Sequence, residues 1–156
     1  MKVLKRFYFY LWCVVLVVLD QLIKLIVLNN FKTESVVIIK NILRVTYCEN
    51  KGVAFSIGNG NVPIFIVVNL LIIGGLIFYF EKNRKFFNKI DKTFFIMIIA
   101  GGISNVVDRI IRGFVVDFID VSDLFNFAIF NIADIFIVIG VFGLITNYIY
   151  KIMKNK

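Results

Sequence analysis

The chain has 156 residues, of which 60% are hydrophobic and 18% charged, with a mean hydropathy of +0.91. A soluble domain is about half apolar and about one quarter charged, so these values exclude a disordered chain, a disulfide scaffold and an ordinary cytosolic enzyme, and they indicate a membrane protein. The net charge is +8. The chain has no histidine, and this excludes Ser-His-Asp and Cys-His catalysis and metal sites with histidine ligands.

Four segments are apolar over nearly the length of about 20 residues that a spanning helix needs. They cover residues 7–28, 62–80, 93–112 and 131–150. Basic residues precede the first, but no small-residue cleavage site follows it, so we interpret it as a retained span rather than a signal peptide. No repeat or linker interrupts the pattern. We therefore expect residues 1–156 to form one domain, an all-α membrane protein with four transmembrane helices.

The charges predict the orientation of these spans. The N-terminal stub, the connection 81–92 and the C-terminus carry 11 basic and 2 acidic residues, whereas the rest of the chain carries 7 and 8. Short basic segments stay in the cytoplasm. We therefore expect both termini and the 81–92 connection to be cytoplasmic, and the segments 29–61 and 113–130 to lie outside.

The outer segments have recognisable patterns. Residues 35–47 are mostly β-branched and apolar, which predicts a short pair of strands. The glycine-punctuated apolar stretch 52–58 predicts a short helix on the membrane surface. Cys13 and Cys48 form no CxxC pair, and we expect both to be unpaired. Gly74-Gly75 and Ala100-Gly101-Gly102 predict close helix packing within the membrane.

Polar residues fall at one depth in the spans. In three of the spans, the stretch without charged residues is too short to cross the hydrocarbon core of the membrane. The charged ends of these spans must therefore enter the outer leaflet or its boundary. Asp20 and Lys24 are spaced to pair on one helical face. The other polar residues at this depth are Asn105, Asp108, Arg109, Asn131 and Asp134. These polar residues are interpreted as one site. The alternative is that they are long side chains that reach back to the membrane interface, which explains Arg112 and Lys24 but not the short acids.

Paired aspartates are the hydrolytic machinery that this composition favours. Two carboxylates held close in a low-dielectric site share one proton, so one acts as base and the other as acid without histidine or metal. We expect no metal or cofactor. Composition leaves five aspartates open, but Asp117 follows the third span and Asp134 opens the fourth, so their positions favour a pair. Asp120 and Asp123 are expected to meet water.

Five motifs occur in order along the chain: Asp20-Gln21-Leu22-Ile23-Lys24, Asn50-Lys51-Gly52-Val53-Ala54-Phe55-Ser56, Asn105-Val106-Val107-Asp108-Arg109, Val115-Val116-Asp117-Phe118-Ile119-Asp120 and Phe130-Asn131-Ile132-Ala133-Asp134. Together they resemble the lipoprotein signal peptidases (signal peptidase II), four-span aspartic peptidases of bacterial membranes. Two residues depart from the family pattern: Ser104 replaces a usual glycine, and Ala128 a usual proline.

The resemblance implies that Asp117 and Asp134 form the catalytic dyad of an intramembrane endopeptidase. Its substrate would be a prolipoprotein, cut before the diacylglyceryl-modified cysteine at the outer leaflet of the cytoplasmic membrane. Family positions that line or support the site are Asn50, Gly52, Asn105, Asp108, Arg109 and Asn131, and Asp20 with Lys24 forms a structural pair. We expect a monomer surrounded by membrane lipids, with no nucleic-acid partner.

Two alternatives belong to other functional classes. A small four-helix exporter would keep an essential acid near the membrane midplane, often in the first span. Asp20 lies about 20 Å along the helix from Arg6, which is past the middle. A non-enzymatic assembly factor would tolerate Asp117→Asn, whereas a peptidase would not.

Overall fold

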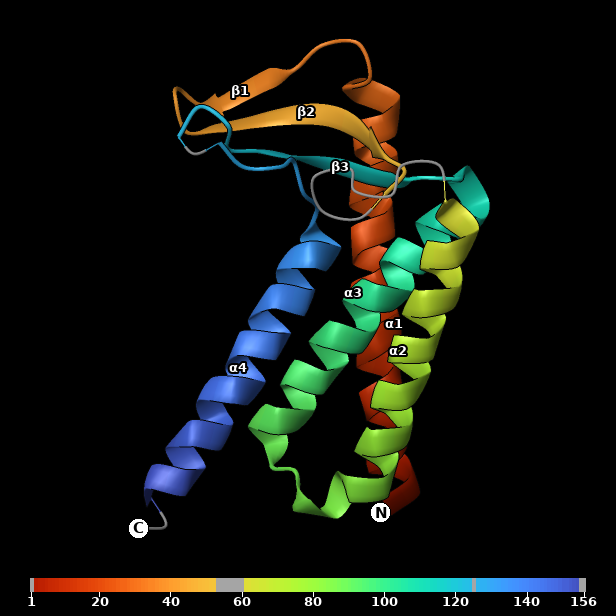
Figure 1. Cartoon of the computed structure of the whole chain (residues 1–156), viewed down its shortest axis with the longest axis vertical. Coiled ribbons are helices and arrows are strands. Elements are labelled where there is room, and N and C mark those ends of the chain that lie inside the picture. The colour runs from red at the N-terminus through yellow and green to blue at the C-terminus, as the bar shows by residue number, and fades with distance from the viewer. Residues whose placement is uncertain (1, 53–60, 125, 155–156) are drawn as a thin grey trace.

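The computed structural model describes residues 2–52, 61–124 and 126–154 (Figure 1). Within these ranges, the elements are the helices α1 (Lys2–Asn30), α2 (Val62–Asn83), η2 (Arg84–Phe86, a short 3-10 helix), α3 (Lys89–Arg112) and α4 (Ile132–Lys154), and the strands β1 (Val36–Ile39), β2 (Leu43–Asn50) and β3 (Val115–Asp120). The four α-helices are long and apolar enough to cross a membrane, and they contain the predicted spans to within one residue. Most of the predicted surface helix at 52–58 lies outside the described residues.

The four spans and the sheet are arranged along one axis. Both chain ends and the connection between α2 and α3 lie at one end of the molecule, and the sheet lies at the other (Figure 1). This is the grouping that the charge pattern predicts. Which end faces the cytoplasm stays a prediction.

The helix α3 is the centre of the bundle. In its apolar stretch 56% of residues are buried, against 22%, 6% and 11% in α1, α2 and α4. It begins in a capping box, in which Asn88 and Asp91 each accept a hydrogen bond from the other's backbone N–H, at 2.8 and 2.9 Å. It ends at Gly113, whose φ of 79° turns the chain directly into β3. This turn brings the strand back over the end of the helix.

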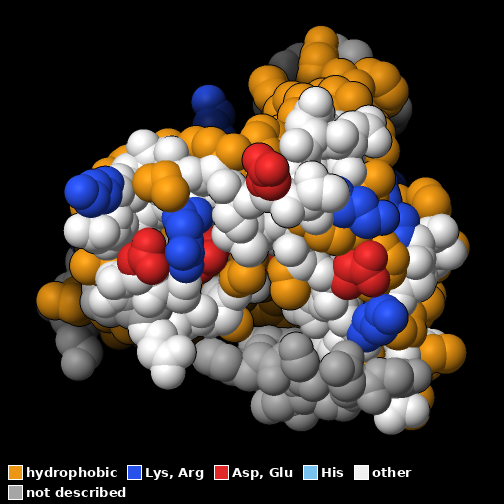
Figure 2. Space-filling model, turned by 90° about the horizontal axis from the view of Figure 1, so that it is seen from above, with side chains coloured by type: hydrophobic (Ala, Val, Ile, Leu, Met, Phe, Trp, Pro, Cys, Tyr) orange, Lys and Arg blue, Asp and Glu red, His pale blue; other side chains and the backbone are white. Residues whose placement is uncertain are grey.

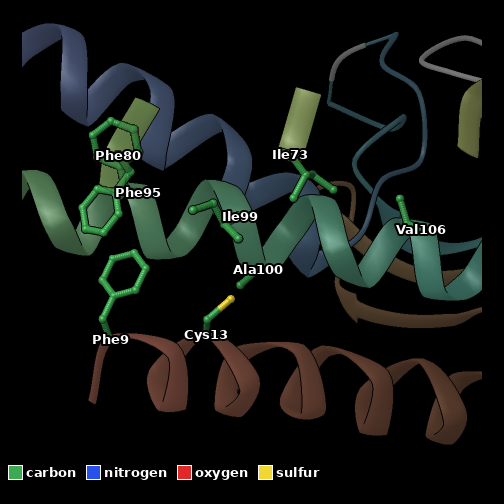
Figure 3. Packing of buried hydrophobic residues seen from close by; sticks show 8 residues of the cluster. All are labelled: Phe9, Cys13, Ile73, Phe80, Phe95, Ile99, Ala100 and Val106. Atoms are coloured by element: carbon green, nitrogen blue, oxygen red, sulfur yellow. The ribbon is translucent and has the colours of Figure 1, made fainter. Parts of the chain in front are cut away.

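An apolar cluster joins the helices α1, α2 and α3 (Figure 3). Phe9 and Cys13 of α1 point toward Phe95 and Ala100 of α3, and Phe80 of α2 stacks on Phe9 with ring centroids 4.3 Å apart. The expectation that Cys13 and Cys48 are unpaired is confirmed. Because most other large apolar side chains of α2 and α4 face outward, these helices present the surface that a lipid environment requires.

Glycine brings α3 and α4 together. A Cβ built on Gly101 would lie 2.4 Å from the carbonyl oxygen of Ala133, and one on Gly140 would lie 2.8 Å from that of Phe94. Close packing is therefore confirmed at Gly101. The prediction of close packing is wrong for Gly74 and Gly75, where no atom of the described residues lies within 4 Å of the added Cβ.

The sheet is antiparallel in the order β1-β2-β3. The predicted strand pair is confirmed as β1 and β2, joined by a turn in which Asn41 has φ of 60°. The third strand was not expected, because the segment 113–130 appeared as an acidic connection. Its Val116 and Phe118 pack with Val27 of α1 beneath the sheet, so β3 closes the bundle at this end.

Acidic and basic side chains lie close together on the sheet end of the molecule, seen from above in Figure 2. Arg44 of β2 contacts Asp120 at 3.2 Å and Asp123 at 3.3 Å. The expectation that Asp120 meets water is wrong, since only 4% of it is exposed. Its carboxylate also accepts hydrogen bonds from the Thr46 hydroxyl and the backbone N–H of Ser122, and these contacts lower its pKa despite burial.

Candidate active site

The polar residues singled out from the sequence converge between the sheet and the adjoining ends of three helices. The structure places Asp20 and Lys24 on α1, Asn105, Asp108 and Arg109 on α3, Asp117 on β3, Asn50 at the end of β2 with Gly52 just beyond it, and Asn131 and Asp134 at the start of α4. Asp134 and Asn50 are half-buried and the others are buried. These residues therefore form one buried polar cluster.

Asp117 is held by two amides. Its Oδ2 accepts a hydrogen bond from Nδ2 of Asn50 at 2.8 Å, and its Oδ1 accepts one from Nδ2 of Asn131 at 2.6 Å. The pKa of Asp117 is raised to about 6, first by burial and then by the neighbouring charge of Asp134, while the hydrogen bonds from Asn50 and Asn131 act in the opposite direction. This carboxyl can therefore exchange a proton near neutral pH.

Asp134 lies in the first turn of α4, where a negative charge is favoured by the helix dipole. Its Oδ2 accepts a hydrogen bond from the backbone N–H of Asn131 at 3.1 Å, and the Asn131 side-chain oxygen accepts one from the N–H of Asp134 at 3.0 Å. This reciprocal pair is a capping box. The other oxygen of Asp134 accepts a hydrogen bond from Asn105 at 2.8 Å.

Asn131 therefore connects the two carboxyl groups. Its amide nitrogen donates to Asp117, while its amide oxygen is held by the backbone of Asp134. The side chain is fully buried, so it has no water to exchange for these partners. One residue thus sets the position of Asp117 relative to the start of α4.

A buried ion-pair network lies beneath the two aspartates. The Nζ of Lys24 is 2.8 Å from a carboxylate oxygen of Asp20 and 2.8 Å from one of Asp108, and it donates to Oδ1 of Asn105 at 3.0 Å. Arg112, four residues further along α3, also pairs with Asp108. Lys24 is fully buried, so the alternative that it reaches the interface is wrong.

The structure accounts for Ser104, one of the two departures from the family pattern. Its hydroxyl donates to Oδ2 of Asp20 at 2.6 Å and accepts a hydrogen bond from Gln21 at 2.9 Å. The other oxygen of Asp20 accepts a hydrogen bond from the backbone N–H of Ala133, in the first turn of α4. Sequence reasoning missed Ser104 and Gln21 as network members because their partners lie more than 80 positions away in the chain.

Arg109 contacts backbone oxygens rather than a carboxylate. It donates to the carbonyl of Gly52 at 2.7 Å and to that of Asn105 at 3.2 Å. Its Nε has no partner among the described residues, although only 6% of the residue is exposed.

A cavity of about 540 Å³ gives access to this cluster. Both Asp117 and Asp134 line it, together with Asn105 and Arg109. Its remaining wall is mostly apolar and runs along α4 from Ile135 to Ile139, with Ala128 and its neighbours on the connection from β3. The site therefore joins two carboxyl groups to an apolar channel. No group of three acidic, cysteine or histidine side chains suited to a metal ion occurs in the described part of the chain.

The comparisons with known proteins agree on one family. The sequence model of the family described as signal peptidase (SPase) II matches residues 12–150. A lipoprotein signal peptidase of Fusobacterium nucleatum is 36% identical over 143 residues, which are 91% of this chain and 86% of that protein. One of Clostridioides difficile strain 630 is 37% identical over 145 residues, or 92% of this chain and 95% of that protein.

A solved structure is similar over almost the same length. A bacterial membrane enzyme determined by the in meso method at 2.3 Å resolution superimposes with a TM-score of 0.86 and 30% identity, covering 96% of this chain and 92% of that one. The family match and the curated relatives decide against the exporter alternative. The chain belongs to the signal peptidase II family, the multi-pass membrane aspartic peptidases that remove signal peptides from prolipoproteins.

Proposed function

We propose that Asp117 and Asp134 are the catalytic dyad and that the bond cut is the one before the diacylglyceryl-modified cysteine of a prolipoprotein. One carboxylate takes a proton from water, whose oxygen bonds to the peptide carbonyl carbon. The other carboxyl gives its proton to the leaving nitrogen as the C–N bond breaks. The products are the free signal peptide and the α-amino group of the lipidated cysteine.

The observation that carries this proposal is the bridge through Asn131, which holds both carboxyl groups on the wall of one cavity. The charges support a shared proton. The cations around the dyad are Lys24 and Arg109, which are buried, and Arg112, which is half-buried, and the other anions are Asp20 and Asp108. Three positive charges balance three negative ones when the dyad keeps one proton, and a neutral cluster is the least costly to bury.

The remaining site residues have supporting roles in this proposal. Asn50, Asn105 and Asn131 orient the carboxyl groups through their amides. Arg109 binds the carbonyl of Gly52 and so fixes the chain that leaves β2. The network of Lys24, Asp20 and Asp108 holds α1 and α3 in place behind the dyad.

The apolar wall of the cavity suits an apolar signal peptide and an acyl chain. It runs along α4, inside a spanning segment, so a substrate anchored in the membrane can enter without leaving the lipid. The charge distribution supports cytoplasmic termini and a site at the outer leaflet. The working unit in this proposal is a single chain, one domain surrounded by membrane lipids, with no nucleic acid.

A gel-shift assay tests the proposal directly. The purified peptidase in detergent is incubated with a prolipoprotein that carries the diacylglyceryl cysteine. A parallel reaction contains the same prolipoprotein without its lipid. Wild type should shorten only the lipidated form. Asp117→Asn and Asp134→Asn should each lose about three orders of magnitude in rate. Asp123→Asn, which changes an exposed carboxylate on the same connection, is the matched control and should keep its activity. Near-normal turnover by either dyad variant would contradict the assignment.

A further inference from the structure

Asp117 borders a second cavity that Asp134 does not reach. This cavity has a volume of about 310 Å³ and is lined by Cys48, Asn50, Asp117 and residues 126–129. None of these residues belongs to a spanning helix. The larger cavity, in contrast, continues along α3 and α4 into the apolar bundle. Asp117 therefore lies on the wall of both cavities, together with Asn50 and residues 127–129, and only the smaller cavity is lined by Cys48 and Asn126.

The position of Cys48 relative to Asp117 is set by the sheet. The two residues are Cα partners in the ladder between β2 and β3. Side chains directly opposite each other lie on the same face of a sheet, with Cβ atoms about 4.5–5.5 Å apart. Elsewhere on the cavity wall, Asn126 is exposed and Phe127 is 52% exposed. The wall of the cavity thus includes exposed residues of the connection after β3 as well as Cys48 and Asp117.

We propose that this smaller cavity is the route by which the hydrolytic water reaches Asp117 while the peptide occupies the larger cavity. The inference rests on the proposed dyad, and it also assigns which of the two aspartates is the base and which is the acid. An apolar peptide that fills the larger cavity removes water from that side, yet each cleavage consumes one water molecule. Water that arrives through the smaller cavity meets Asp117 and not Asp134.

Because the water arrives on the side of Asp117, the order of the proton transfers follows. Asp117 takes a proton from the water as its oxygen bonds to the carbonyl carbon. The one proton that the pair shares is on Asp134 when water meets Asp117, and Asp134 gives it to the leaving nitrogen. After cleavage Asp117 holds a proton and Asp134 is ionised, so one proton passes from Asp117 to Asp134 before the next turnover. Atoms and charges balance without any further reactant.

Substitution at Cys48 tests the route, because this side chain lines the cavity without hydrogen-bonding to the dyad in the described structure. Cys48→Phe fills the space, and Cys48→Ala enlarges it. With the lipidated prolipoprotein in detergent, Cys48→Phe should lower kcat about tenfold and leave KM nearly unchanged, whereas Cys48→Ala should keep kcat. Loss of water around Asp117 raises the pKa of its carboxyl, so the acid limb of the pH profile should move to higher pH in Cys48→Phe alone.

A second measurement does not depend on folding of the Phe variant. In a Cys13→Ala background, Cys48 of the folded protein is converted with methyl or benzyl methanethiosulfonate. Burial and the charge of Asp117 raise the pKa of the Cys48 thiol, so labelling needs an alkaline pH. The benzyl adduct should block turnover and the methyl adduct should not, with activity restored by a reductant.

Two outcomes would overturn the route. Full turnover by the benzyl adduct, with complete labelling shown by mass, would show that water enters elsewhere. A raised KM, together with protection of Cys48 by substrate, would show that the mature chain occupies the cavity instead. Asp117→Asn separates these results from a failure of the dyad: if it is inactive, only the route is wrong, and if it is active, the dyad itself is wrong.

Discussion

The ammonium nitrogen of Lys24 lies 3.0 Å from Oδ1 of Asn105, and this contact determines which way the Asn105 amide points. With its oxygen held by a cation, the amide presents its nitrogen to Asp134, 2.8 Å away. Asp20 and Asp108 satisfy the other two N–H donors of Lys24. A buried cation is tolerated when each donor has a partner, so the ammonium group orders the site at little net cost.

Replacement of Lys24 should therefore destabilise the protein strongly. Lys24→Met leaves Asp20 and Asp108 buried with fewer partners, and we expect a loss of about 3–5 kcal/mol in the free energy of unfolding. Lys51→Met is the control, since this side chain is 54% exposed and lies 4.0 Å from Glu49, and its loss should stay below about 1 kcal/mol. Denaturant unfolding in detergent measures both. Equal losses would contradict the network.

Ser104 offers a test of a family departure. Ser104→Gly restores the usual family residue but removes a hydrogen bond to the buried Asp20 carboxylate. We expect retained cleavage with a stability loss of about 2 kcal/mol, from the hydrogen bond and from glycine within a helix. Ser104→Ala keeps the helix propensity and should lose about half as much. A more stable Ser104→Gly would show that the hydroxyl contributes nothing.

Close packing of α3 on α4 positions Asp134. Alanine substitutions at two glycines, one in this contact and one outside it, test this. Gly101→Ala places a Cβ against the carbonyl of Ala133, one residue before Asp134, and should shift the start of α4. A displacement of about 1 Å at a catalytic group can cost about a hundredfold in rate. Gly75→Ala places its Cβ more than 4 Å from every other atom that the structure describes outside its own helix backbone and chain neighbours, so kcat should be unchanged. Equal kcat values in the lipoprotein cleavage assay would contradict the packing argument.

Much of the fold could be predicted because membrane constraints are local. Apolar length placed the four helices, and the spacing of Asp20 and Lys24 gave their pairing correctly. The strand β3 was missed because its partners are about 65 to 75 residues earlier in the chain and its two aspartates are unusual in a strand. Long-range pairing of this kind leaves no local pattern.

In the site, too, the features that depend on local sequence could be predicted and those that depend on long-range pairing could not. The position of Asp117 after a span and of Asp134 at a helix start could be read from the chain, since both depend on local boundaries. The burial of Asp120 could not, because it depends on Arg44 and Thr46 from another strand. The opposition of Cys48 and Asp117 likewise depends on the register between β2 and β3, which includes a bulge after Val45.

Labelling of single cysteines in sealed cells tests the orientation. In a background without Cys13 and Cys48, we expect Ser35→Cys at the sheet end to react with a membrane-impermeant maleimide. Lys85→Cys, at the α2–α3 connection, should react only after the membrane is opened. Both positions are exposed, so accessibility in the protein itself does not differ. The reverse pattern would place the sheet and the site in the cytoplasm.

The pH dependence of cleavage reports the protonation of Asp117. Its pKa is raised to about 6, first by burial and then by the charge of Asp134. Because the base must be ionised, kcat/KM should fall about tenfold for each pH unit below about 6. The hydrogen bond from Asn50 stabilises the ionised form, so Asn50→Ala should raise this pKa and move the acid limb up by about one pH unit.

Thr46→Val is the matched control for this shift. It removes a donor of the same sheet, but one that serves Asp120 at 3.0 Å rather than the dyad. Its acid limb should coincide with that of wild type. A limb near pH 4 in wild type, or equal shifts in the two variants, would show that Asp117 does not supply the base. A shift confined to Asn50→Ala would tie the limb to the carboxyl that this amide holds, because the two variants differ in which aspartate loses its donor.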